Sequence, residues 1–240
     1  GVFSMRTTRL RNFGCAALAL LACAPAMAYD WLQFNGNPQH DGNNVQERSI
    51  TRNNVGRLIR RYQASLGDIS DNAPVFLEGV STAGGIKDLL YVTTLGGSTF
   101  AIDAATGAIV WSKSYPANGC TNPGIGPCNT MSTPAIDPDR NFVYAYGLDG
   151  KVHKLAVGTG NETLTSAWPI AVTLKPQNEK SAGAIGFAQS GGKTYLYVVS
   201  GGYPGDCCDY QGHVTTIDLA TGAQKVFNTN CSDLKTHLDI

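Results

Sequence analysis

The stretch LLYVTTLGGSTFAIDAATGAIVWSKSY, residues Leu89–Tyr115, decides the fold that this sequence predicts. It contains three short segments rich in apolar and β-branched residues, a composition typical of β-strands. These segments are Leu89–Thr94, Thr99–Asp103 and Ala108–Lys113. Turn-forming residues separate them, first Gly96-Gly97 and then Ala104–Gly107. The stretch therefore predicts an antiparallel meander with two tight turns.

Five residues at fixed spacing mark the second half of this stretch. They are Ala101, Asp103, Thr106, Gly107 and Trp111. We expect the Asp103 carboxylate to accept hydrogen bonds from N–H groups of the turn, and Gly107 to adopt a positive φ. The flat Trp111 ring is expected to lie over a gap left by a residue as small as Ala101. This spacing resembles the tryptophan-docking repeat of the quinoprotein β-propellers at each defined position.

The same pattern recurs along the chain with a regular period. Tyrosines in strand-like segments are spaced by 53 residues (144 − 91 and 197 − 144), at Tyr91, Tyr144 and Tyr197. Thr106-Gly107 recurs 53 residues on as Thr159-Gly160, and 62 residues after that as Thr221-Gly222. The third copy is longer by nine residues (62 − 53) because PGDCCDYQG is inserted. A period near fifty with four short strands per unit is typical of propeller blades.

The sequence therefore predicts an all-β propeller of four-stranded antiparallel blades that is incomplete in this chain. The expected blades are Ala73–Lys113, Ser132–Val172 and Ser181–Asn228. The motif weakens along the chain, since Ala156 replaces the aspartate in the second copy and Val226 replaces the tryptophan in the third. The alternative fold is an ordinary antiparallel sandwich with similar turns. Three repeats cannot close a ring, so further blades are expected beyond residue 240.

The N-terminal part also resembles the start of quinoprotein-like propellers. Trp31 and Phe34 lie among turn formers in Tyr29–Asn44, and Leu58–Ser65 has the composition of a strand. The resemblance implies that an N-terminal strand closes the ring by adding to the last blade. Such closure removes exposed sheet edges.

Residues 1–28 are predicted to be a signal peptide, with four extra residues before Met5, and residues 29–240 the propeller domain. Three arginines precede the apolar run Cys15–Cys23, which is too short to span a bilayer. Ala26-Met27-Ala28 then provides a cleavage site before Tyr29. Acylation of Cys23, as in a lipoprotein, is the alternative. Either route predicts export to the periplasm or beyond.

The charge balance excludes some partners at the level of the whole chain. The sequence has 18 basic and 18 acidic residues, and removal of the three leader arginines leaves 15 against 18. A net charge near −3 (15 − 18) favours neither nucleic acid nor an anionic membrane. No transmembrane segment is predicted after residue 28.

Two groups of cysteines carry the expected covalent chemistry. Cys120 and Cys128 are eight residues apart in a Pro/Gly-rich loop, and export predicts a disulfide between them. Cys207-Cys208 is a vicinal pair within the inserted segment of the third repeat. It predicts either a strained vicinal disulfide or two cysteines with separate partners, such as Cys208 with Cys231. Five cysteines remain after the leader, so one is left without a partner in the chain.

The resemblance to quinoprotein alcohol dehydrogenases gives the vicinal pair a further meaning. It implies that Cys207 and Cys208 contact pyrroloquinoline quinone, which calcium would accompany. The calcium ligands and the catalytic aspartate of those enzymes have no match in this sequence, and no metal ligand or catalytic residue is identified. Two functions therefore stay open. One is a quinone-dependent dehydrogenase, and the other is a propeller scaffold that binds proteins or polymers in the cell envelope.

Overall fold

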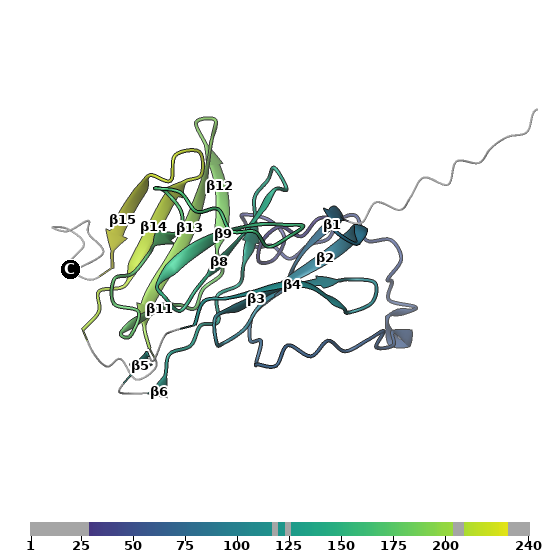
Figure 1. Cartoon of the computed structure of the whole chain (residues 1–240). Coiled ribbons are helices and arrows are strands. Elements are labelled where there is room, and N and C mark those ends of the chain that lie inside the picture. Colours follow the sequence, from purple (N-terminus) through teal and green to yellow (C-terminus); the bar gives the residue numbers. More distant parts are fainter. Residues whose placement is uncertain (1–28, 117–119, 123–125, 204–208, 230–240) are drawn as a thin grey trace, which may run out of the picture.

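A computed structural model describes residues 29–116, 120–122, 126–203 and 209–229 of this protein. Figure 1 shows that the described chain consists of antiparallel sheets placed one after another, from β1 to β15. The helical content of this part is the single 3-10 turn η1 (Val55–Arg57). The predicted signal peptide, Cys23, Cys207, Cys208 and Cys231 fall outside the described residues.

The first sheet is a four-stranded meander. Its strands are β1 (Val75–Thr82), β2 (Gly85–Thr93), β3 (Ser98–Asp103) and β4 (Ile109–Ser114), hydrogen-bonded in that order. Tyr91 pairs with Ala101, and Ala101 pairs with Trp111, so these three side chains share one face of the sheet. The register shifts after Ala101, because Ile102 pairs with Ile109 and Val110 is left as a bulge.

The second and third sheets repeat this topology. The second contains β7 (Ala135–Ile136), β8 (Phe142–Tyr146), β9 (Lys151–Ala156) and β10 (Ile170–Ala171). The third contains β11 (Glu179–Ser181), β12 (Gly186–Ser190), β13 (Lys193–Gly202), β14 (His213–Asp218) and β15 (Gln224–Asn228). Both β11 and β12 pair with β13, so the first strand of this blade is broken in two. A small hairpin of β5 (Thr121–Asn122) and β6 (Gly126–Pro127) follows the first blade and precedes the second along the chain.

The hydrophobic cores lie between successive blades. One cluster joins residues of the first sheet, such as Tyr91 and Trp111, to Ile136, Val143 and Leu155 of the second. A second cluster joins the second sheet to the third. Blades that bury their faces against the next blade form a propeller, so the predicted fold class is confirmed. The described blades do not form a closed ring.

The N-terminal segment contacts the first strand of every described blade. Trp31 exchanges two backbone hydrogen bonds of 2.9 Å with Phe76 in β1. The Leu32 carbonyl accepts a hydrogen bond from Ile136 in β7 (2.7 Å), and the Gln33 side chain accepts one from the Phe187 amide in β12 (2.9 Å). This segment thus ties the three blades together along their first strands.

The strand expected over Leu58–Ser65 is wrong for the structure described. The segment has no strand partner among the described residues, and the last blade, which was its expected partner, is not among the three described blades. Side chains nevertheless alternate between exposed and half-buried from Arg61 to Leu66. The segment thus has the alternating burial of a strand but, among the described residues, no hydrogen-bonded partner strand.

Candidate functional site

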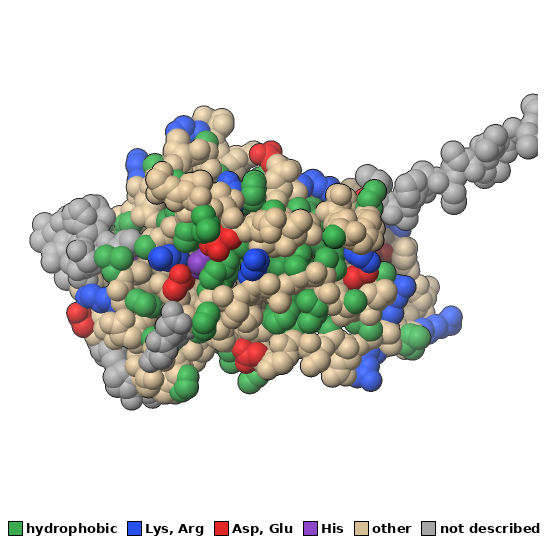
Figure 2. Space-filling view, viewed as in Figure 1, with side chains coloured by type: hydrophobic (Ala, Val, Ile, Leu, Met, Phe, Trp, Pro, Cys, Tyr) green, Lys and Arg blue, Asp and Glu red, His purple; other side chains and the backbone are tan. Residues whose placement is uncertain are grey.

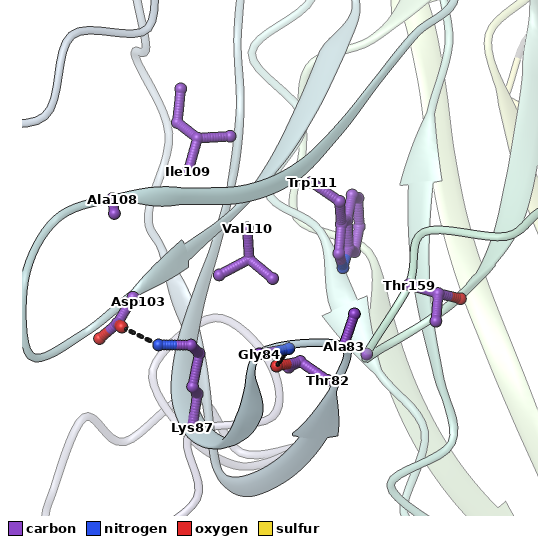
Figure 3. Close-up of a pocket in the computed structure, with 11 residues that line it drawn as sticks. Thr82, Ala83, Gly84, Lys87, Asp103, Ala108, Ile109, Val110, Trp111 and Thr159 are labelled. Carbon is purple, nitrogen blue, oxygen red and sulfur yellow. Dashed lines mark hydrogen bonds and ion pairs between the residues drawn. The ribbon is translucent and has the colours of Figure 1, made fainter.

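The predicted docking residues lie where the first blade meets the second. Trp111 is 8% exposed, and its Nε1 donates a 2.8 Å hydrogen bond to the carbonyl of Val157. Its ring covers Gly160, where an added Cβ would lie 2.7 Å from the indole. Gly160 has a φ of +68°, which glycine adopts without strain. Figure 3 shows Trp111 directed toward the loop that carries Thr159.

The turn between β3 and β4 is organised around Asp103. Its carboxylate accepts a hydrogen bond from the Ala105 amide (2.8 Å) and an ion pair from Lys87 (2.6 Å), drawn in Figure 3. The Lys87 ammonium holds the pKa of this carboxyl below its usual value. The Thr106 hydroxyl accepts a hydrogen bond from the Ala108 amide. Gly107 has a φ of +78°, and a Cβ there would overlap the Tyr62 ring.

The third blade repeats this turn chemistry with different residues. Asp218 accepts hydrogen bonds from the Ala220 amide (3.0 Å) and the Lys193 ammonium (2.8 Å). On the neighbouring strand, Lys225 is paired with Thr216, whereas Trp111 is paired with Ala101 in the first blade. The absence of the bulge in this ladder places Lys225, not Val226, at the register position of the tryptophan.

Trp168 is a docking residue that the spacing of the motif did not reveal. It is 5% exposed and lies 5.2 Å from Tyr144, much as Trp111 lies 5.8 Å from Tyr91. The strand partner of Tyr144 is Lys154, whose ammonium lies 5.5 Å from the Trp168 ring. A lysine stem fills more space than an alanine, and in this blade the indole comes from later in the chain. An Ala-Trp-Pro sequence soon after the Thr-Gly turn was the available signal.

Two loops whose sequences contain cysteines are attached to one short turn, Lys175–Asn178. One contains Cys120 and Cys128, and the other contains Cys207 and Cys208. A disulfide joins Cys120 and Cys128, and within this loop Asn122 donates a 2.9 Å hydrogen bond to the Gln177 carbonyl. On the other side, Tyr203 donates to the Pro176 carbonyl (3.1 Å). Asp209 is held by Lys175 (2.8 Å) and by the Asn178 amide (2.9 Å).

The flanks of the vicinal cysteine pair are therefore fixed to this turn. Tyr203 precedes the undescribed residues and Asp209 follows them. The positions of Cys207 and Cys208 themselves lie outside the described residues, so their contact with a quinone stays a prediction.

A buried acid joins the same region to the third blade. Glu179 and His213 are each 1% exposed, and their side chains are 3.0 Å apart. Glu179 also accepts hydrogen bonds from the Thr173 hydroxyl and from the amides of Gln211 and Gly212. Burial alone would raise the pKa of Glu179, but the hydrogen bonds from His213, Thr173 and Gly212 outweigh it and lower the pKa.

This pair does not form a nucleophilic relay. Ser200 and Glu179 both approach Nδ1 of His213, at 3.2 Å and 3.0 Å. A relay needs the acid and the nucleophile on different ring nitrogens. The buried Glu179–His213 pair is thus a structural connection between β11 and β14.

His153 connects the first two blades. Its ring is stacked on Tyr115, with centroids 3.4 Å apart, and contacts Glu162 (2.6 Å) and Asp149 (3.1 Å) through its two nitrogens. The Tyr115 hydroxyl donates to Glu162 (2.9 Å). The two nitrogens of this buried strand histidine point to different carboxylates rather than to one shared metal.

The described residues contain no gathered set of calcium ligands. Glu179 uses both carboxylate oxygens on internal hydrogen-bond partners. In the described ranges, no three His, Cys, Asp or Glu side chains gather in a group that could hold a metal ion. Calcium needs six to eight oxygen ligands.

The fold and the docking contacts define a β-propeller chain built from tryptophan-docking repeats. Residues 56–229 match the family described as outer membrane protein assembly factor BamB, and the chain belongs to this family. No curated protein sequence matches the chain. Within the described residues, no helix has the length and apolar character needed to cross a membrane.

Solved structures similar to this chain include two quinohemoprotein alcohol dehydrogenases and a methanol dehydrogenase. Quinohemoprotein alcohol dehydrogenase ADHIIG from Pseudomonas putida HK5 aligns over 82% of this chain with a TM-score of 0.56 and 20% identity. The enzyme from Comamonas testosteroni aligns over 82% with a TM-score of 0.54 and 21% identity. A europium-containing methanol dehydrogenase aligns over 83% of this chain with a TM-score of 0.56 and 19% identity. The chain spans 26%, 26% and 32% of these structures, and the similarity establishes the fold.

Proposed function

We propose that this chain is a propeller scaffold that is exported and binds a protein or polymer in the cell envelope. The observation that carries the proposal is the shared attachment of two loops to the Lys175–Asn178 turn. A disulfide closes one of the loops, and polar side chains fasten the other. Loops held on a rigid framework are where propellers and similar folds place their binding surfaces.

Two further observations support this role. The family to which the chain belongs is named for an assembly factor of the outer membrane. The predicted leader at residues 1–28 supports export to the same compartment. A scaffold requires the blades and a fixed surface, and the described residues supply both.

A crosslinking experiment tests the scaffold. A photoreactive amino acid at Leu174, which is 56% exposed beside the turn, should give a discrete crosslinked species in the envelope fraction of cells. The same amino acid at Ser112, exposed on β4 away from the turn, is the matched control. Equal crosslinking from both positions, or none from Leu174, would count against a binding surface at this turn.

The second candidate is a quinone-dependent dehydrogenase. It is favoured by the sequence Cys207-Cys208-Asp209, whose last residue is held by Lys175, and by the quinoprotein fold. Titration of the full-length gene product with pyrroloquinoline quinone and calcium, followed by dye reduction with alcohols and sugars, separates the two. Micromolar binding, about −8 kcal/mol, together with loss of turnover in Cys207→Ser would establish the enzyme. Absence of quinone binding to the folded protein would leave the scaffold.

A further inference from the structure

The interface between the second and third blades contains a cavity of about 310 Å³. The second blade lines it with side chains that include Asp137, Phe142, Tyr144 and Lys154, and the third blade adds the turn at Leu219. The lining residues belong to two blades whose faces pack against each other in the structure. The cavity is therefore enclosed by neighbouring blades and is not a blade face left open for a further blade.

The two described interfaces differ at one tyrosine. In the first interface, the Tyr91 hydroxyl donates a 3.1 Å hydrogen bond to the Val157 carbonyl. Tyr144 has the corresponding place in the second interface and is 1% exposed, yet its hydroxyl has no hydrogen-bond partner among the described residues. The strand partner of Tyr91 is Ala101, whereas that of Tyr144 is Lys154. A hydroxyl without a protein partner needs water or a ligand, so the Tyr144 hydroxyl is available to a molecule in the cavity.

Two charged groups in the cavity also have unused hydrogen-bonding capacity. The Lys154 ammonium forms no ion pair with any described residue, and it lies 4.2 Å from the centre of the Phe142 ring. Asp137 is 6% exposed, and its Oδ1 accepts hydrogen bonds from the amides of Asn141 (2.8 Å) and Phe142 (3.3 Å). Its Oδ2 has no partner in the described part of the chain. Burial lowers the pKa of Lys154 and raises the pKa of Asp137, because each charge has lost part of its water.

We propose that this cavity binds a neutral sugar unit, either free or as one residue of a glycan. Sugar hydroxyl groups both accept and donate hydrogen bonds, so they can accept from Lys154 and Tyr144 and donate to Asp137. The side chains of Phe142 and Leu219 provide apolar contacts for the C–H groups of the sugar ring. Ligand cavities begin at about 300 Å³, so this one has room for a single small unit.

The charges of the cavity disfavour other ligand classes. A phosphate would face the carboxylates of Asp137 and Asp139, and a cation would face the unpaired Lys154 ammonium. An apolar ligand would remove water from three polar groups without replacing their hydrogen bonds. The face shown in Figure 2 likewise has acidic and basic side chains interspersed over the blades, with no broad patch of one sign to attract an ion.

The cavity is distinct from the surface proposed to bind an envelope partner. Lys193 lines the cavity and begins β13. Gly202 ends β13 and pairs with Glu179, which follows the Lys175–Asn178 turn. The two sites thus lie at opposite ends of one strand. The inference goes beyond the scaffold role, and it stands or falls separately from the crosslinking result.

Saturation-transfer NMR of the full chain with glucose, galactose and N-acetylglucosamine tests the proposal. At least one of these sugars should show saturable binding to the folded protein. The 6-phosphate of that sugar should bind no more tightly, because the cavity contains the two carboxylates of Asp137 and Asp139. Absence of saturable binding by all three sugars would overturn the proposal. Tighter binding of the phosphorylated sugar would indicate an anion site and would also overturn it.

Two tyrosine variants separate binding from stability. Tyr144→Phe removes a hydroxyl that has no partner in the described structure, so it should weaken sugar binding roughly three- to tenfold and leave the urea midpoint unchanged. Tyr91→Phe is the matched control, because its hydroxyl is bonded to Val157. It should lower the urea midpoint and leave sugar binding unchanged. An equal loss of sugar binding in both variants would contradict a site at Tyr144.

A lysine variant provides a second measurement at the same site. Lys154→Met keeps an unbranched stem but removes the ammonium, and it should weaken sugar binding by about tenfold or more, because a hydrogen bond from a charged donor is lost. Circular dichroism matching that of the parent protein shows that each variant has folded. Unchanged sugar affinity in Tyr144→Phe and Lys154→Met would place the binding elsewhere on the molecule and would overturn the proposal.

Discussion

Replacing Gly160 by alanine should destabilise the protein more than the same change at Gly192, because only Gly160 lies under an indole ring. The two glycines have similar positive φ values, +68° and +74°. An alanine Cβ at Gly160 would lie 2.7 Å from the Trp111 ring, whereas a Cβ at Gly192 would meet nothing within 4 Å. Left-handed backbone costs an alanine about 1 kcal/mol at either site. Displacing a packed ring adds about 1–3 kcal/mol, so we expect about 1 kcal/mol at Gly192 and about 2–4 kcal/mol at Gly160.

The contact can be isolated by removing the ring itself. Trp111→Ala should cost about 3–5 kcal/mol, since the side chain is 8% exposed. The Val157 carbonyl that loses the indole donor still accepts the Tyr91 hydroxyl at 3.1 Å, so the variant leaves no new unpaired acceptor. In the Trp111→Ala background, Gly160→Ala should cost no more than Gly192→Ala, because the atoms that collide are gone.

Urea unfolding followed by far-ultraviolet circular dichroism measures all six proteins on one scale, and unchanged m-values would show that the unfolded states are comparable. The reasoning is refuted if Gly160→Ala and Gly192→Ala lose equal stability in the parent protein. It is also refuted if the excess cost at Gly160 persists after Trp111 has been removed.

Three further predictions concern covalent chemistry and pH. The double change Cys120→Ser, Cys128→Ser should lower the free energy of unfolding by about 2.5 kcal/mol, the loop-entropy value for an eight-residue separation; urea melts showing no loss would contradict it. The pKa of Glu179 is lowered in the folded state. The contribution of this carboxylate to the free energy of unfolding is therefore present above the unfolded pKa and disappears as the pH falls through the folded pKa. The stability advantage over Glu179→Gln should therefore shrink in urea melts below about pH 4, and a constant advantage would be the contrary result. Mass spectrometry of the exported protein should find Tyr29 as the first residue, whereas an acylated Cys23 would show a lipoprotein.

The blades could be predicted because their signals are local and repeated. A tight turn with an aspartate and a glycine is stabilised by residues close in sequence, so its structure can be predicted from a short stretch. The turns at Asp103 and Asp218 accordingly show the same hydrogen bond, from the amide two residues further on to the aspartate. The Tyr91, Tyr144 and Tyr197 period places each copy in the second strand of its blade or its equivalent, β2, β8 or β13. Period and turn chemistry together define the fold class before any long-range contact is known.

Long-range contacts could not be predicted in the same way. Trp168 lies four residues beyond the motif position at Leu164, and its docking depends on the lysine stem of Lys154 across the strand. The strand-like composition of Leu58–Ser65 does not indicate whether a partner strand is available. The attachment of two loops to the Lys175–Asn178 turn joins residues between 27 and 55 positions apart, and no spacing rule anticipates it. The net charge near zero likewise conceals the five arginines and single acid between Val45 and Arg61, because acids elsewhere in the chain balance them.

The docking motif therefore indicates how blades pack rather than which ligand they bind. The position of Ala101 is occupied by Lys154 in the second blade and by Thr216 in the third, yet both blades still form antiparallel sheets. Both blades keep a glycine with a positive φ that packs against the preceding blade. Trp111 of the first blade covers Gly160, and Ala167 of the second blade covers Gly222. Resemblance in these residues to quinone enzymes thus supports the shared fold, and the binding properties of this chain must be sought in its loops.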